Sequence, residues 1–142
     1  MKKILVINGP NLNLLGLREP ALYGAQNFEA LQGFIVECAA EYGVEVELFQ
    51  SNHEGVIVDK IQAAYRVFDA ILINPAAYTH TSVAILDALK AVALPTVEVH
   101  LTDISTREEF RRFSYISFYA QKTICGKGFD GSREGLHYLS QL

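Results

Sequence analysis

The sequence predicts an α/β fold in which helices cover both faces of a parallel β-sheet. Short apolar runs alternate with amphipathic stretches five times along the 142 residues, which is typical of repeated strand–helix units. The first run, residues 3–8, is apolar enough for a buried strand. The sequence shows neither an internal repeat nor a low-complexity linker. The length fits one domain over residues 1–142, large enough to bury a core without disulfides or metal.

The apolar runs predict five strands, at residues 3–8, 44–49, 70–74, 96–100 and around 123–126. The amphipathic stretches predict helices at 28–42, 55–67, 82–93 and 132–142, with a short helix at 107–113. A long loop rich in Gly, Pro and Asn, residues 9–24, follows the first strand. Right-handed crossovers between five parallel strands favour a flavodoxin-like three-layer sandwich with strand order 2-1-3-4-5.

Several helix ends have recognisable caps. Asn27 is expected to cap the start of helix 28–42, and Gly43 to end it. Ser105 and Glu108 have the spacing of a capping box for the short helix.

Helix 82–93 has almost no polar face, which predicts burial on more than one side. Two arrangements explain it: another subunit covers the helix, or the last helix of the chain lies over it. Half of all residues are hydrophobic, which favours contact with other subunits.

Charge and composition argue against several classes of protein. The net charge of -4 argues against a nucleic-acid partner. The apolar run at the N-terminus is too short for a signal peptide, and none is long enough to span a membrane. Cys38 and Cys125 are expected to be buried thiols in a reducing compartment, so the protein is expected in the cytoplasm. Arg107, Arg111 and Arg112 lie close together in the sequence, which leaves open a local basic site for a small anion.

Polar residues gather after three of the predicted strands. In open parallel sheets, ligands bind outside the carboxyl ends of the strands, where the strand order reverses. The residues at these ends are Asn11, Asn13, Arg18 and Tyr23 after the first strand, Asn74 and His80 after the third, and Glu98 and His100 at the end of the fourth. Residues far apart in sequence are therefore expected to meet in one crevice.

Glu98 and His100 are two positions apart on a strand and so point to the same face. A carboxylate beside an imidazole favours the protonated ring and fixes its orientation, which suits a general acid. A strand-end pair without chemistry fits the pattern equally well.

Tyr23 is a candidate general base. A free tyrosine has a pKa of about 10, so a base near neutral pH needs a downward shift of about 3 units. One arginine lowers a pKa by about 1–3 units, and Arg18 and Arg107 are the candidates. A tyrosine that anchors a surface loop fits the same sequence.

Other polar positions also have structural interpretations. Asn11 and Asn13 are ordinary turn residues, Asn74 is followed by proline, and residues 79–82 suit a helix cap or an anion site. The GxGxxG run at 126–131 comes too near the end of the sequence for a dinucleotide-binding unit. Scattered histidines and cysteines argue against zinc, so no metal site is expected.

Five segments resemble the type II 3-dehydroquinate dehydratases. They are ILVINGPNLNLLGLREPALYG at 4–24, FQSN at 49–52, INPAAYTHTSVAILDAL at 73–89, VEVHLTDISTREEFRRFSYIS at 97–117 and ICGKGFDG at 124–131. The resemblance covers essentially the whole chain in order. It departs from the common pattern at residues 103–106, Gln62 and Lys127.

The resemblance implies a lyase that dehydrates 3-dehydroquinate to 3-dehydroshikimate through an enolate, without cofactor or metal. Tyr23 would be the base that removes the proton from C2, and Arg18 and Arg107 would hold it as tyrosinate. His100, oriented by Glu98, would protonate the departing C1 hydroxyl. The reaction would serve the shikimate pathway to chorismate and aromatic amino acids, or quinate breakdown.

The resemblance also implies the binding residues and the assembly. Asn11 would position a water at the enolate oxygen, and the amides of Leu101 and Thr102 would hold the substrate carboxylate. Three side chains would bind substrate hydroxyls: Asn74, His80 and Arg111. Residues 18–24 would form a lid. Asp87 would reach the site of a neighbouring subunit within a homododecamer of four trimers.

Two other classes remain as alternatives. One is a catalytically silent assembly that binds a quinate-like ligand, and the other is a flavodoxin-like nucleotide-binding module. The silent assembly disagrees with the presence of base, acid and arginines. The nucleotide module lacks a recognisable phosphate loop after the first strand.

Overall fold

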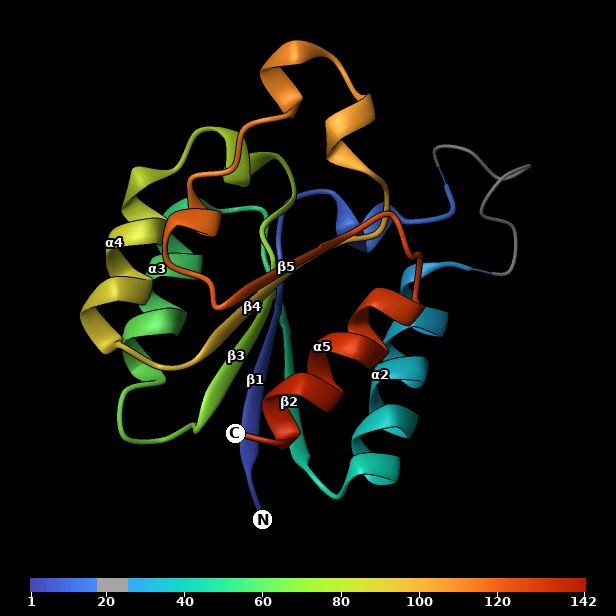
Figure 1. The fold of residues 1–142 in the computed structure, drawn as a ribbon, viewed down its shortest axis with the longest axis vertical. Helices are drawn as coiled ribbons and strands as arrows, with labels where there is room; N and C mark the ends of the chain where they lie inside the picture. Colours follow the sequence, from blue (N-terminus) through green and yellow to red (C-terminus); the bar gives the residue numbers. More distant parts are fainter. Residues whose placement is uncertain (18–25) are drawn as a thin grey trace.

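The computed structural model describes residues 1–17 and 26–142 and contains a five-stranded, all-parallel sheet (Figure 1). The strand order is β2-β1-β3-β4-β5, as the sequence predicts. The strands are β1 (Lys3–Asn8), β2 (Glu45–Gln50), β3 (Ala70–Asn74), β4 (Thr96–His100) and β5 (Lys122–Cys125).

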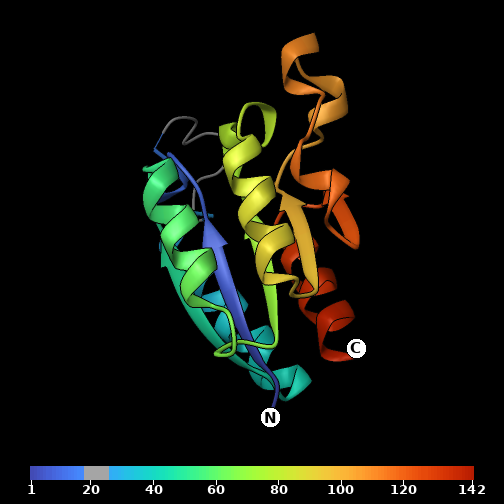
Figure 2. The same ribbon diagram turned by 90° about the vertical axis from the view of Figure 1, so that its left-hand side faces the viewer.

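Helices cover both faces of this sheet, so the predicted three-layer sandwich is confirmed. The helices are α2 (Phe28–Tyr42), α3 (Glu54–Ala63), α4 (Val83–Val92) and α5 (Asp130–Ser140). Helices α2 and α5 pack together on one face, and α3 and α4 pack together on the other (Figures 1 and 2).

The core is divided by the sheet into two apolar clusters. On β1, Ile4 and Val6 point toward α2 and α5, whereas Leu5 and Ile7 point toward α3 and α4. This alternation follows from the two-residue period of a strand. Both faces of the central strands are buried, which is why their sequences are continuous apolar runs.

Helix α2 begins and ends where its caps predict. Asn27 Oδ1 accepts a hydrogen bond from the Ala30 amide at 2.8 Å, and Gly43 ends the helix with a φ of 68°. Helix α3 is shorter than predicted, because the chain leaves the helix after Ala63 and Arg66 adopts a φ of 62°. The turn places Phe68 in the core.

The predicted helix at 107–113 is wrong. The chain forms two separate 3-10 turns there, η3 (Ile104–Thr106) and η4 (Glu109–Arg111). Asp103 Oδ1 accepts hydrogen bonds from both the amide and the hydroxyl of Ser105, at 2.9 and 2.6 Å. Ser105 is therefore occupied by Asp103, and the capping box with Glu108 does not form.

Helix α4 packs its apolar side on α3 and on η5 (Ile116–Phe118). The interpretation in which the last helix covers α4 is wrong, because α5 lies across the sheet from it (Figure 1). The side away from the sheet is exposed and includes Val83 and Asp87.

Both cysteines are free thiols. Cys38 on α2 is buried as expected, and burial raises the pKa of its thiol. Cys125 is only half-buried, so the expectation of burial is wrong for it. The reason is its place at the end of β5, which is an edge strand.

The glycine-rich run between β5 and α5 forms a tight turn. Gly126 and Gly128 have φ values of 77° and 55°, which glycine adopts without strain. Within residues 1–17 and 26–142, no helix combines the length and hydrophobicity needed to cross a membrane.

Candidate active site

A cavity of about 820 Å³ lies beyond the carboxyl ends of β1, β3 and β4. This is where the strand order reverses, as expected for a ligand site in such a sheet. Eight residues singled out from the sequence line it: Asn11, Asn74, His80, His100, Leu101, Thr102, Arg107 and Arg111. The fold thus brings together side chains that are separated by up to a hundred positions.

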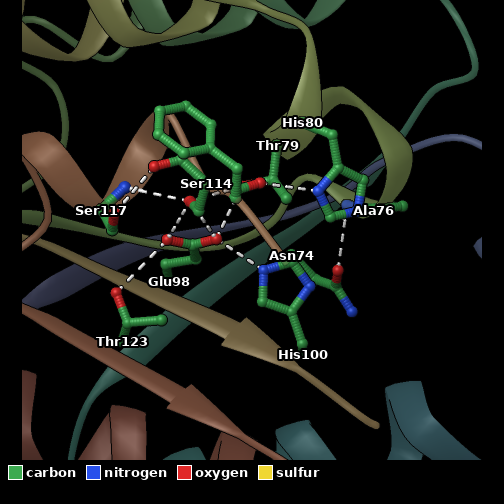
Figure 3. A network of polar contacts seen from close by, with 10 residues as sticks. Asn74, Ala76, Thr79, His80, Glu98, His100, Ser114, Ser117 and Thr123 are labelled. Carbon is green, nitrogen blue, oxygen red and sulfur yellow. Dashed lines mark hydrogen bonds and ion pairs between the residues drawn. The ribbon is translucent and has the colours of Figure 1, made fainter. Parts of the chain in front are cut away.

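Glu98 and His100 form a buried pair at the end of β4 (Figure 3). His100 Nε2 lies 2.5 Å from Glu98 Oε2, and the side chains are 6% and 0% exposed. Since Nε2 is engaged by the carboxylate, Nδ1 is the nitrogen left to exchange a proton with a ligand. His100 lines the cavity and Glu98 lies behind it.

Three hydroxyl groups from other segments surround the Glu98 carboxylate (Figure 3). Thr79 Oγ1 donates to Oε2 at 2.6 Å, Ser114 Oγ lies 2.8–2.9 Å from both oxygens, and Thr123 Oγ1 lies 3.3 Å from Oε1. Burial alone raises the pKa of Glu98. The hydrogen bonds and charge of His100, with the hydroxyls of Thr79 and Ser114, outweigh burial and lower this pKa.

The sequence interpretation missed these hydroxyl residues. The sequence predicts Thr79 as part of a helix cap or an anion site, but the residue that caps α4 is Ser82, whose Oγ accepts from the Ile85 amide at 2.9 Å. Thr79 is fully buried and Ser114 is nearly so. In the sequence, Thr79 lies between Tyr78 and His80, and Ser114 between Phe113 and Tyr115, and these neighbours identify no partner for either hydroxyl.

Asn74 ends β3, and its side chain both shapes a turn and lines the cavity. Its Oδ1 accepts a hydrogen bond from the Ala76 amide at 3.1 Å, which shapes the turn through Pro75. The same side chain lines the cavity, and its amide group carries two N–H donors for a ligand.

His80 is held in one orientation by a backbone carbonyl. Its Nδ1 lies 2.7 Å from the carbonyl oxygen of Phe113. Because a carbonyl oxygen only accepts, Nδ1 must carry the proton. In the neutral ring, Nε2 is then a hydrogen-bond acceptor at the cavity wall.

The segment after β4 offers donors suited to an anion. The backbone amides of Leu101 and Thr102 make no hydrogen bond with any residue in the described part of the chain. Arg107 Nη1 donates to Thr102 Oγ1 at 3.3 Å, and Arg111 also lines the cavity. Two guanidinium groups beside two unpaired amides favour a bound carboxylate.

Asn11 has a left-handed backbone conformation with a φ of 70°, and its backbone amide donates a hydrogen bond to Asn52 Oδ1 at 3.0 Å. Gln50 Nε2 contacts the same oxygen at 3.2 Å. Asn52 therefore fixes the loop that carries Asn11, a role that its place in the FQSN run did not reveal.

Two predicted residues, Arg18 and Tyr23, fall outside the described residues, together with the whole of the predicted lid, 18–24. Asp87 is exposed on α4 and does not line the cavity of its own chain. Within the described ranges, no group of three or more His, Cys, Asp or Glu side chains is arranged to hold a metal ion.

A family model, Dehydroquinase class II, matches residues 2–140. The chain belongs to the class II dehydroquinase family. The resemblance that its motifs indicate is therefore confirmed.

Other members of the dehydroquinase family match over nearly the full length. The 3-dehydroquinate dehydratase of Geotalea daltonii is 54% identical over 96% of this chain and 95% of its own. The catabolic 3-dehydroquinase 2 of Neosartorya fischeri is 54% identical over 97% of this chain and 92% of its own. The crystal structure of the type II dehydroquinase from Butyrivibrio crossotus has a TM-score of 0.93 and 48% identity, covering 97% of both chains.

Proposed function

We propose that this dehydroquinase removes water from 3-dehydroquinate to give 3-dehydroshikimate through an enolate. The observation that carries the proposal is the His100–Glu98 pair, which opens on a cavity that also holds Arg107 and Arg111. The same cavity is lined by Leu101 and Thr102, whose backbone amides have no hydrogen-bond partner among the described residues. This set matches the two demands of the substrate, which are a carboxylate to bind and a hydroxyl to protonate.

The first step is removal of a proton beside the ketone. The C2–H bond breaks, the proton passes to the phenolate of Tyr23, and the electron pair forms an enolate whose oxygen is the former ketone oxygen. Such a proton is only weakly acidic, so the reaction needs a strong base and stabilisation of the enolate. Asn11 at the cavity wall supports this step by holding a water against the enolate oxygen.

The second step expels the C1 hydroxyl. The enolate electrons re-form the ketone and a C1–C2 double bond, and the C–O bond breaks as His100 Nδ1 donates a proton. Water leaves, because hydroxide is a poor leaving group without that proton. The buried Glu98 carboxylate supports this step, since it favours the imidazolium form and fixes the ring.

The remaining residues have binding roles. Leu101 and Thr102 hold the carboxylate through their amides, and Asn74, His80 and Arg111 hold the hydroxyls. The same reaction serves aromatic biosynthesis through the shikimate pathway or quinate breakdown. One relative that matches this chain is named a catabolic 3-dehydroquinase, and another is named simply 3-dehydroquinate dehydratase. The two free thiols support a reducing, cytoplasmic location.

We further propose a homododecamer of four trimers, in which Asp87 reaches a neighbouring site. Support comes from the exposed outer side of α4 and from Phe110, Phe113 and Phe118, which are 66%, 47% and 66% exposed. The rings of Phe113 and Phe118 have centroids 5.7 Å apart, and exposed aromatic side chains this close together favour a subunit contact. Light scattering should give twelve times the monomer mass of 15.8 kDa, and a stable monomer would contradict the proposal.

The enzymatic proposal is tested by following the absorbance of the conjugated enone product. The purified protein should generate it from 3-dehydroquinate, with and without EDTA. Tyr23→Phe should fold and bind but lose turnover, and His100→Ala should lose about 100-fold or more in kcat. A wild-type protein that binds the substrate without product formation would favour the silent assembly. A near-normal kcat in Tyr23→Phe would reject the tyrosinate.

A further inference from the structure

The Glu98 carboxylate joins four separate parts of the fold. Its hydrogen-bond partners come from η2 (Ala76–His80), from the segment after η4, from β5 and from β4 itself. Thr79 and Ser114 make the shortest hydroxyl contacts, at 2.6 and 2.8 Å. Among the described residues these two do not line the cavity, so they act on a ligand only through Glu98.

Thr79 and Ser114 are held in place by hydrogen bonds from nearby backbone amides and by their contact with each other. The Tyr115 amide donates to the Thr79 carbonyl at 2.8 Å, and the Thr79 and Ser114 hydroxyl oxygens lie 2.7 Å apart. The Ser117 amide donates to Ser114 Oγ at 3.1 Å, which turns the serine proton toward its acceptors. The hydroxyls are therefore preorganised around the carboxylate (Figure 3).

We propose that Thr79 and Ser114 are positioning residues whose hydroxyls keep Glu98 ionised and aimed at His100 Nε2, so that His100 stays protonated for the dehydration step. This inference rests on the proposed function of His100 as the general acid. According to this proposal, the two buried hydroxyls determine whether the proton shared by Glu98 and His100 resides on the carboxylate or on the imidazole.

The physical reason is a competition for one proton between Glu98 and His100. Hydroxyl donors stabilise a carboxylate more than a neutral carboxyl. Without them, the proton moves from Nε2 to Glu98, and the imidazole becomes a neutral ring with a much weaker acidic N–H. Among the described residues, the other titratable group that interacts with Glu98 is Cys125 on β5, whose pKa is raised first by burial and then by the Glu98 charge.

The test uses variants that separate the hydroxyl from the side-chain volume. Thr79→Val removes the hydroxyl and keeps the shape, Thr79→Ser keeps the hydroxyl, and Ser114→Ala removes the second donor. Thr81→Val is the matched control, because Thr81 is exposed two positions away from Thr79.

The first measurement is the pH profile of kcat. In Thr79→Val and Ser114→Ala the acid limb should move up by about one pH unit, the shift that one or two lost hydrogen bonds to a carboxylate produce. At a given pH on the acid limb, kcat should therefore fall by up to about tenfold, with KM nearly unchanged. Thr79→Ser and Thr81→Val should retain the wild-type profile.

The second measurement is the nitrogen NMR spectrum of the imidazoles, which needs no turnover. The chain has four histidines, and the His100 signals are assigned by their loss in His100→Gln. In the hydroxyl-deleted variants these signals should move from imidazolium toward the neutral ring at a given pH. Since Ser114→Ala and Thr79→Val are independent, a folding defect in either leaves the other as the test.

Two results separate this inference from the proposed function. If His100→Ala loses turnover, but Thr79→Val and Ser114→Ala leave the acid limb and the His100 signals unchanged, the positioning role is wrong and the function stands. If His100→Ala keeps a normal kcat, the general acid is itself misassigned and both proposals are overturned.

Discussion

The Nδ1 atom of His80 donates a 2.7 Å hydrogen bond to the carbonyl oxygen of Phe113, 33 positions further along the chain. This bond ties η2 to the segment after η4 and decides which ring nitrogen is protonated. Nε2 is thereby left at the cavity wall as a hydrogen-bond acceptor. Both η2 and η4 supply residues to the cavity wall, and this bond helps to hold the two segments together.

The two functions of His80 can be separated by isosteric replacement. Asn places an N–H donor where Nδ1 lies, so His80→Asn should keep the bond to Phe113 and lose the acceptor. We expect KM to rise about tenfold, the cost of one hydrogen bond to the ligand, with thermal stability unchanged. His80→Ala should raise KM and also lower Tm. If His80→Asn leaves KM at the wild-type value in steady-state assays, Nε2 does not contact the substrate.

Arg111 is expected to contribute binding rather than chemistry. Arg111→Ala should lower kcat/KM by about 10–100-fold, because a charge-assisted hydrogen bond contributes about 1.5–3 kcal/mol. The control is Arg133→Ala, which removes the same charge from an exposed ion pair with Glu41 on the α2–α5 surface. Equal kinetic losses in the two variants would mean that overall charge, rather than the position of Arg111, matters.

The lowered pKa of Glu98 predicts a loss of stability in acid. A carboxyl whose folded-state pKa is depressed contributes stability above its unfolded pKa, and that contribution disappears as the pH falls through the folded value. The free energy of unfolding of the wild type, measured with urea, should therefore decrease below about pH 4.5, the ordinary pKa of Glu.

Glu98→Gln isolates this contribution from those of the other carboxyls. At neutral pH it should lose about 3–5 kcal/mol of unfolding free energy, because His100 loses its buried partner. The difference from wild type should shrink as the pH falls. A difference that stays constant with pH would show that the Glu98 charge is not the source.

Helix α5 approaches the sheet closely at Gly135. An added Cβ there would lie 2.7 Å from Leu72 Cδ1 and 3.3 Å from Val97 Cγ1, so Gly135→Ala should destabilise the fold by about 1–3 kcal/mol. Gly33 on α2 is the matched control, with no neighbour within 4 Å of such a Cβ. Gly33→Ala should stabilise by about 0.5–1 kcal/mol, since alanine favours the helix. Thermal unfolding of both variants measures the contrast, and similar Tm changes would contradict the close approach at Gly135.

The sequence by itself determined the strands, their order and the crevice, because apolar periodicity and right-handed crossovers leave few alternatives. It also placed Glu98 and His100 on one face of β4, since a strand alternates its side chains every residue. Its errors in secondary structure fall in segments 64–67 and 103–113, where side-chain hydrogen bonds and turns override helical spacing.

Only the tertiary structure decided how the buried pair is completed. Thr79 and Ser114 are 35 positions apart and meet at Glu98 because η2 and the segment after η4 pack together over β4. The same packing sets the proton on His80 Nδ1. No local pattern encodes such contacts, because hydroxyl and carbonyl groups occur throughout the chain, and a partner is selected only when burial removes water as the competitor.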